Sequence, residues 1–263
     1  MPIDDVRVGE LRDGLGTQTM WSQVEWVATT GSTNADLAAR ARGGASEGMV
    51  RISDEQTSGR GRLARTWVSP AGASLSMSVL LWPDHGGEAW GWLSLLAGMA
   101  ITDALEELAP PEATVELKWP NDVLIDGKKV CGILSERIEQ PDGARAVVGM
   151  GINIALTQEE LPVPNATSLL LAGFEVRSVD VAAGVLRHFE RLYRKWRRDA
   201  DLRVPYQRRC ASIGTELRIV VSETETVTGR GVGVDQFGRL LVETAGGVRA
   251  FAVGDVIHAR LPR

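Results

Sequence analysis

The sequence predicts an α+β protein in which a mixed or antiparallel sheet with helices is followed by a small β-barrel. Three observations lead to this prediction. Helical periodicity occurs in separate stretches, the strands between residues 114 and 150 are joined by tight turns, and the chain after Cys210 contains short strands only. Tight turns join antiparallel strands, whereas a doubly wound parallel sheet needs helical crossovers. We place the boundary between a larger domain, 21–212, and the barrel, 213–263, near Ile213.

The first elements follow from local signals. Residues 1–20 are mixed polar without a period, so we expect a flexible or loosely docked leader. A strand over 23–29 precedes a helix that starts at Thr33-Asn34-Ala35-Asp36, which has the arrangement of a capping box, and ends at Gly43-Gly44. A strand over 49–53 then leads into the polar loop Thr57-Ser58-Gly59-Arg60-Gly61-Arg62.

The remaining elements are read in the same way. Apolar residues alternate with small polar ones over 75–81, as in a strand, and recur at helical spacing from Trp92 until Pro110-Pro111. Further strands are expected over 115–117, 123–125, 130–138 and 147–148, and a long helix over 179–198. Short strands separated by the turns Asp235-Gln236-Phe237-Gly238 and Gly246-Gly247 then predict the barrel.

Composition excludes several classes of protein. With 44% hydrophobic and 24% charged residues, the chain is not a disordered scaffold. A net charge of −5 argues against a protein that coats nucleic acid. The apolar stretch 90–101 is too short to span a membrane, and the N-terminus lacks the layout of a secretory signal, so we expect a cytoplasmic protein. Cys131 and Cys210 give neither a disulfide framework nor a zinc spacing.

Lysine is scarce in this chain. Of 29 basic residues four are lysines, and Lys118, Lys128 and Lys129 fall within twelve positions. A lysine ammonium is a compact point charge, which indicates a specific use for it here. The alternative is that these lysines are solvent-exposed charges of a hairpin.

Three short motifs could carry chemistry. Gly59-Arg60-Gly61-Arg62 combines backbone N–H groups with two guanidinium groups, which suits carboxylate or phosphate oxygens. Lys118-Trp119-Pro120-Asn121-Asp122 places a cation, an amide and a carboxylate in a rigid turn after a strand. Gly149-Met150-Gly151-Ile152-Asn153 lacks the third glycine of a dinucleotide loop, so we reject a Rossmann interpretation.

Taken in order, five motifs resemble the biotin–protein ligase family from about Trp26 to the C-terminus. They are Gly31-Ser32-Thr33-Asn34, Glu55 to Arg62 with Trp67, Lys118 to Asp122, Lys128 to Leu134, and Gly149 to Asn153. The resemblance implies a biotin/lipoate ligase-like catalytic domain over 21–212 and an SH3-like barrel. It also implies that biotin and ATP, with Mg²⁺, form biotinyl-5′-adenylate, and that biotin then passes to a lysine of a biotin carboxyl carrier domain.

The resemblance also implies roles for individual residues. Lys129 would be the principal catalytic cation, Arg62 would order the loop and bind the adenylate phosphate, and Lys118 would support them. Biotin would be bound by Ser32, Thr33, Asn34, Gln56, Arg60, Gly61, Arg62, Lys129 and Gly132. The nucleotide would be bound by Trp67, Asn121, Asn153 and Arg260.

Structural alternatives stay open for several of these residues. Ser32 or Thr33 could only cap a helix, Gln56 could be a loop hydrogen bond, and Trp67 could pack in the core. Asp122 could bind Mg²⁺ or cap a turn, so the metal ligands are left unassigned.

The resemblance is to the monofunctional type, because only about 25 residues precede the first motif, so DNA binding is not expected. No membrane partner is expected, and the protein would be a monomer or weak homodimer. Two alternatives remain, a lipoate or octanoate ligase or transferase of the same fold and a non-enzymatic nucleic-acid-binding module. The loop from Gly59 to Arg62 is expected to be mobile without ligand, with its arginines unpaired until an anion arrives.

Overall fold

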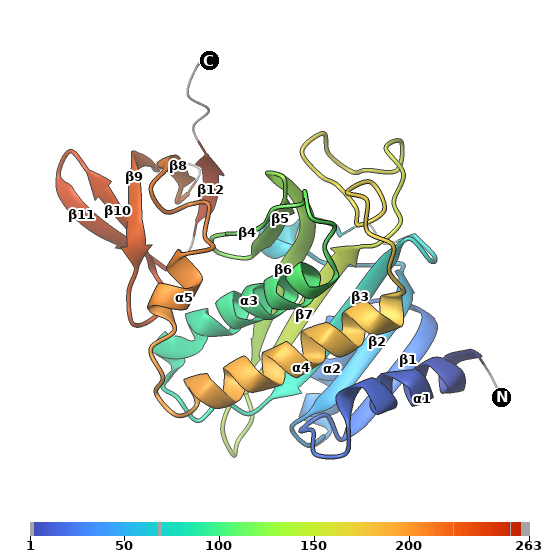
Figure 1. Cartoon of the computed structure of the whole chain (residues 1–263). Helices are drawn as coiled ribbons and strands as arrows, with labels where there is room; N and C mark the ends of the chain where they lie inside the picture. The colour runs from blue at the N-terminus through green and yellow to red at the C-terminus, as the bar shows by residue number, and fades with distance from the viewer. Residues whose placement is uncertain (1–2, 68–69, 223, 253, 259–263) are drawn as a thin grey trace.

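The computed structural model describes residues 3–67, 70–222, 224–252 and 254–258. These residues form a seven-stranded mixed sheet with helices, followed by a five-stranded antiparallel sheet (Figure 1). The predicted α+β class and the small C-terminal β-domain are therefore confirmed.

The large sheet is mixed because only its first two strands are parallel. β1 and β2 run in parallel and are connected by a helix, whereas the other neighbouring pairs are antiparallel. In spatial order the strands are β1 (Gln23–Thr30), β2 (Met49–Gln56), β3 (Ser74–Leu81), β7 (Arg145–Asn153), β6 (Lys128–Ile138), β5 (Asp122–Ile125) and β4 (Val115–Lys118).

Helices cover both faces of this sheet (Figure 1). Leu75, Met77, Val79 and Leu81 of β3 join the main core beneath α3 (Gly91–Leu108) and α4 (Ser178–Trp196), because alternate residues of a strand face the same side. Leu80 faces the opposite side and packs with α2 (Thr33–Arg42). The two 3₁₀ turns span Arg62–Ala64 and Gly87–Trp90.

The C-terminal β-domain begins with β8 (Glu216–Val220), after the short helix α5 (Arg203–Gln207). Its strands are all antiparallel to their neighbours. In spatial order they are β11 (Gly247–Phe251), β10 (Leu240–Thr244), β9 (Thr226–Val234), β8 (Glu216–Val220) and β12 (Asp255–His258).

The prediction of a flexible leader is wrong, because residues Ile3–Leu15 form helix α1, which packs against α4 and β1. Leu11 is fully buried, and Val8 and Leu15 pack against the same core. These three residues follow a helical spacing that was masked by the charged residues between them. Arg7 fixes the helix further, since its guanidinium pairs with Asp54 at 2.7 Å.

We expect Leu11→Ala to lower the free energy of unfolding by about 2–5 kcal/mol, because it removes a fully buried side chain and leaves a cavity under α1. Urea unfolding measures the loss. Val6→Ala is the matched control, since Val6 lies on the same helix with 44% of its surface exposed. Equal stabilities of the two variants would show that α1 does not contribute to the core.

Candidate functional site

A cavity of about 670 Å³ lies between the large sheet and the C-terminal β-domain. Its walls come from the start of α2, the loop after β2, the β4–β5 turn, β6, β7 and the segment 162–166, with Val220, Val256 and Ile257 from the C-terminal β-domain. Every site residue proposed from the sequence lines it, apart from Arg260, which lies outside the described residues. The predicted residues gathered there are Ser32, Thr33, Asn34, Gln56, Arg60, Gly61, Arg62, Trp67, Lys118, Asn121, Lys129, Gly132 and Asn153.

The N-terminus of α2 lines the cavity with Ser32, Thr33 and Asn34. Ser32 is the N-cap, and its hydroxyl accepts a hydrogen bond from the Ala35 N–H at 3.4 Å. The Thr33 N–H and hydroxyl both donate to Gln56 Oε1, at 2.8 and 3.1 Å. Capping the helix and lining the cavity are therefore compatible roles for Ser32, and the positive end of the helix dipole faces the cavity.

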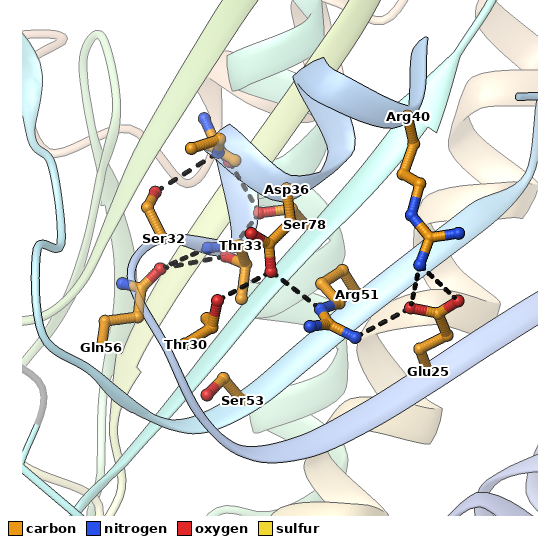
Figure 2. A network of polar contacts seen from close by, with 12 residues as sticks. Glu25, Thr30, Ser32, Thr33, Asp36, Arg40, Arg51, Ser53, Gln56 and Ser78 are labelled. Atoms are coloured by element: carbon orange, nitrogen blue, oxygen red, sulfur yellow. Dashed lines mark hydrogen bonds and ion pairs between the residues drawn. The ribbon is translucent and has the colours of Figure 1, made fainter. Parts of the chain in front are cut away.

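A polar network holds this end of α2 against β1 and β2 (Figure 2). Asp36 accepts hydrogen bonds from Thr30 Oγ1 at 2.8 Å and Arg51 Nε at 2.9 Å. Arg51 also pairs with Glu25 at 2.8 Å. Because these residues join the first turn of α2 to both strands, the groups that face the cavity are held in a fixed arrangement.

Asn34 is buried, and both the nitrogen and the oxygen of its side-chain amide make hydrogen bonds. Its Nδ2 donates to the Leu134 carbonyl at 3.1 Å and to Glu136 Oε2 at 2.7 Å, and its Oδ1 lies 2.6 Å from the Ser78 hydroxyl. The Ser78 hydroxyl is also 2.7 Å from Thr33 Oγ1. Ser78 and Glu136 therefore set the orientation of the side chains at the start of α2.

Glycines on β6 and β7 let the side chains of Asn34 and Trp67 pack directly against the strands. A Cβ at Gly149 would lie 2.1 Å from Asn34 Oδ1, and one at Gly151 would lie 2.4 Å from the Trp67 ring. A Cβ at Gly132 would lie 2.9 Å from the same ring. Gly149 and Gly151 share one face of β7 because they are two residues apart. The Gly149–Asn153 segment is thus part of a strand whose glycines make room for side chains of other elements. It is not a dinucleotide-binding loop, in agreement with our rejection of a Rossmann interpretation.

The arginine loop, residues 59–67, is closed by its own backbone. Gly61 N–H donates to the Arg65 carbonyl at 2.7 Å, and Trp67 N–H donates to the Gly59 carbonyl at 2.9 Å. Arg62 donates to Asn121 Oδ1 at 3.1 Å, and Arg60 pairs with Glu136 at 3.2 Å. The expectation that these arginines are unpaired without an anion is therefore wrong, because neighbouring strands supply oxygen acceptors.

Lys129 is a half-buried cation that lines the cavity. Its ammonium pairs with Asp122 at 2.6 Å and lies 5.8 Å from the centroid of the Trp67 ring. A register shift between Val123 and Leu124 inserts an extra residue in β6. Simple alternation would place Lys129 and Gly132 on opposite faces, but the bulge brings Nζ to 3.3 Å from the Cβ position of Gly132. Lys129 is therefore not a solvent-exposed hairpin charge.

Trp67, Asn121 and Asn153 line the same cavity. Trp67 is half-buried, and its indole N–H has no hydrogen-bond partner in the described part of the chain. Asn121 Nδ2 donates to the Ile133 carbonyl at 2.8 Å, and Asn153 Nδ2 donates to the Thr167 carbonyl at 2.9 Å. The two amides are held by the backbone, whereas the Trp67 indole N–H is buried against Gly151 of β7.

Metal ligands and nucleophiles are sparse at this site. Within the described ranges no three His, Cys, Asp or Glu side chains lie together as a metal cluster would require. Asp122 is the one carboxylate among the described lining residues, and it already pairs with Lys129. Burial raises the pKa of Cys131 far above its usual value, so this thiol is not a nucleophile near neutral pH.

Two residues that hold the site in place, and three that line it, were missed from the sequence. Ser78 sits in an alternating strand, where a serine is normally read as a solvent-facing residue, and Glu136 lies in a strand outside any motif. Both contact lining residues at the start of α2. Pro162, Val163 and Asn165 line the cavity from a loop without regular structure. No local signal marks these five residues, because their contacts arise only from the tertiary fold.

Comparison with known proteins agrees with this arrangement. The family model "Biotin/lipoate A/B protein ligase family" matches residues 28–153, and "Biotin protein ligase C terminal domain" matches residues 213–259. The chain is 41% identical to the biotin–[acetyl-CoA-carboxylase] ligase of Mycobacterium tuberculosis over 98% of this chain and 97% of that protein. It is 34% identical to the bifunctional ligase/repressor BirA of Bacillus subtilis, over 94% of this chain and 77% of that protein.

Among solved structures, the biotin protein ligase of Aquifex aeolicus in complex with biotin and ATP superposes with a TM-score of 0.76 at 28% identity. The match covers 91% of this chain and all of that one. Among the described helices, none combines the length and apolar composition needed to cross a membrane. From the matched families, the relatives and the shared fold, this chain belongs to the biotin protein ligase family.

Proposed function

We propose that this chain joins biotin to ATP as biotinyl-5′-adenylate and transfers the biotinyl group to a lysine of the carrier domain of acetyl-CoA carboxylase. The main support is a single cavity that contains polar groups at one end and the Lys129 cation near an unpartnered indole N–H at the other. The M. tuberculosis relative carries this activity in its name, and the A. aeolicus relative has biotin and ATP bound.

The α2 end of the cavity suits the ureido ring of biotin. Ser32, Thr33 and Gln56 supply hydroxyl and amide groups, and they are fixed by α2 and β2 before a ligand arrives. Gly149 of β7 lets the Asn34 side chain pack against the strand beside these groups. Preorganised hydrogen-bonding groups in a cavity favour a rigid, neutral, bicyclic headgroup.

The other end suits the reacting groups. A carboxylate oxygen of biotin attacks the α-phosphorus of ATP, the bond to the bridging oxygen breaks, and pyrophosphate leaves with the electron pair. Lys129, Arg62 and Lys118 would neutralise the two anions as they approach. In the second step a deprotonated carrier lysine attacks the acyl carbon, and AMP leaves.

The nucleotide would lie near Trp67, Asn121 and Asn153. The Trp67 ring lines this part of the cavity, and Asn121 accepts a hydrogen bond from Arg62, which lines it as well. Mg²⁺ would accompany ATP and be held mostly by phosphate oxygens and water, as is usual for this ion. Asp122 is the nearest carboxylate for it, but its pairing with Lys129 leaves the metal ligands unassigned.

The direct test is incubation of the protein with biotin, ATP, Mg²⁺ and a biotin carboxyl carrier domain. Biotin on the carrier lysine and equimolar pyrophosphate are expected. Octanoate and lipoate in place of biotin test the related acyl ligases. Salt-dependent binding of generic DNA or RNA without biotin transfer would support the nucleic-acid-binding alternative instead.

We expect Gly149→Ala to raise the KM for biotin at least about tenfold, because the new methyl group would lie 2.1 Å from Asn34 Oδ1 and would displace that side chain. Steady-state kinetics of pyrophosphate release measure this change. Gly86→Ala is the matched control, because a Cβ there meets nothing within 4 Å. An unchanged KM for biotin in Gly149→Ala would contradict a role of Asn34 in biotin binding.

A further inference from the structure

The turn between β9 and β10, residues 235–239, lies directly against the catalytic domain. Gly238 has φ +78°, and a Cβ on it would lie 3.0 Å from Leu95 Cδ1 of α3. On the other side of the contact, a Cβ on Gly91 would lie 2.9 Å from the Phe237 carbonyl. Two backbones therefore meet at this point, which only residues without a side chain allow.

Two indole groups of the catalytic domain donate into this turn. Trp92 Nε1 donates to the Gln236 carbonyl at 2.9 Å, and Trp119 Nε1 donates to the Gly238 carbonyl at 3.0 Å. Both tryptophans are almost completely buried. A buried indole N–H left without an acceptor is costly, so each bond holds the turn in one position.

The turn is rigid in itself. Asp235 Oδ1 accepts hydrogen bonds from the backbone N–H groups of Phe237 at 2.9 Å and Arg239 at 3.0 Å. Asp235 N–H also donates to the Arg239 carbonyl at 3.0 Å. A turn fixed in this way can hold a neighbouring side chain in place instead of moving with it.

Trp119 differs from Trp92 in its position along the chain. It lines the cavity together with Lys118 and Asn121 on either side, and one residue further on is Asp122, the partner of Lys129. Asn121 in turn accepts a hydrogen bond from Arg62. The position of the Trp119 ring therefore determines the position of the groups that face the reacting anions.

The linker to the C-terminal β-domain holds the same segment from its other side. Leu117 N–H donates to the Arg209 carbonyl, and Ala211 N–H donates to the Leu117 carbonyl, both at 2.8 Å. The Trp119 N–H lies 3.3 Å from the Ser212 hydroxyl. The residues before the cavity are thus attached to the linker, and the Trp119 ring is attached to the 235–239 turn.

We propose that Trp119 is a positioning residue, and that the C-terminal β-domain acts through the 235–239 turn and this indole to hold Lys118, Asn121 and Asp122 in place for the nucleotide. This inference rests on the proposed function. As a positioning residue, Trp119 contacts no reacting atom. Its effect is carried by the backbone of residues 118–122, so loosening it should affect the ATP end of the cavity and spare the biotin end.

Trp119→Phe keeps the ring and removes the N–H donor. We expect kcat/KM for ATP in biotin-dependent pyrophosphate release to fall about fivefold to twentyfold, with the KM for biotin unchanged. Trp92→Phe is the matched control, because it removes a hydrogen bond of similar length to the same turn outside the cavity segment. A comparable fall in melting temperature with less than a twofold change in kcat/KM is expected for this control.

A second pair of variants leaves both tryptophans in place. Gly238→Ala should lower kcat/KM for ATP like Trp119→Phe, because its methyl group would push the turn away from α3. Gly247→Ala shares the strain of a positive φ, +101°, but its methyl group would meet nothing within 4 Å, so it should lower stability alone. This pair keeps the inference testable if Trp119→Phe does not fold.

Two outcomes would overturn the inference. Equal kinetic losses in Trp119→Phe and Trp92→Phe would show a general loosening of the contact, and wild-type kinetics in both Trp119→Phe and Gly238→Ala would show a structural role only. A wild-type protein without biotin-dependent pyrophosphate release would instead contradict the proposed function, so the two failures are distinguishable.

Discussion

Lys129→Ala is expected to slow biotin-dependent pyrophosphate release about 100- to 1000-fold, the range observed when one charge-stabilising donor is removed from an active site. The ammonium lies in a half-buried position beside Trp67, where solvent screens its charge less than at the surface. The variant also leaves Asp122 without its cation, which places an uncompensated negative charge where the phosphates would bind. Both effects raise the barrier to bringing two anions together.

The neighbouring lysine provides the control for this prediction. Lys128 has the same charge and lies one residue earlier in β6, but it is exposed and outside the cavity. Lys128→Ala should keep the rate within about twofold of wild type. A rate near wild type in a folded Lys129→Ala variant, checked by its melting curve, would exclude Lys129 from catalysis.

The elements, and the gathering of the motif residues around one cavity, could be predicted from the sequence where the signal was local. The helix start at Thr33, the alternation in β3 and the tight turns between β4 and β7 all correspond to structure, although the N-cap is Ser32 and Asp36 bonds to Thr30 and Arg51 instead of completing a capping box. The family motifs converge on one cavity because each lies at the end of a strand or the start of a helix that reaches it.

The rest depends on contacts between distant parts of the chain. The extra residue in β6 that turns Lys129 toward Gly132 leaves no trace in the local pattern. Helix α1 was missed because charged residues interrupt the apolar positions Val8, Leu11 and Leu15, which are recognisable as one face only once the core that covers them is known. The acceptors for Arg60 and Arg62 lie 76 and 59 residues away in sequence.

Arg62→Gly is expected to release biotinyl-adenylate about tenfold to a hundredfold faster than wild type, and to biotinylate lysines of bystander proteins. Arg62 extends from the arginine loop toward Asn121, and a charge-assisted hydrogen bond from it to the adenylate phosphate would contribute about 1.5–3 kcal/mol. The glycine removes this contact and loosens the backbone that covers the acyl adenylate. A reactive mixed anhydride that leaves the cavity then meets water and exposed amines.

Two measurements separate the causes. Arg62→Met removes the charge but keeps a side chain of similar length, so faster release in both variants assigns the effect to the lost charge, whereas release in Arg62→Gly alone assigns it to the loosened loop. Amide hydrogen exchange over residues 56–65 should slow in the wild type when biotin and ATP bind, because the adenylate adds a partner to Arg62 beyond Asn121. If bystander labelling does not rise in either variant and exchange is unchanged by ligands, the arginine loop is a static turn and does not retain the adenylate.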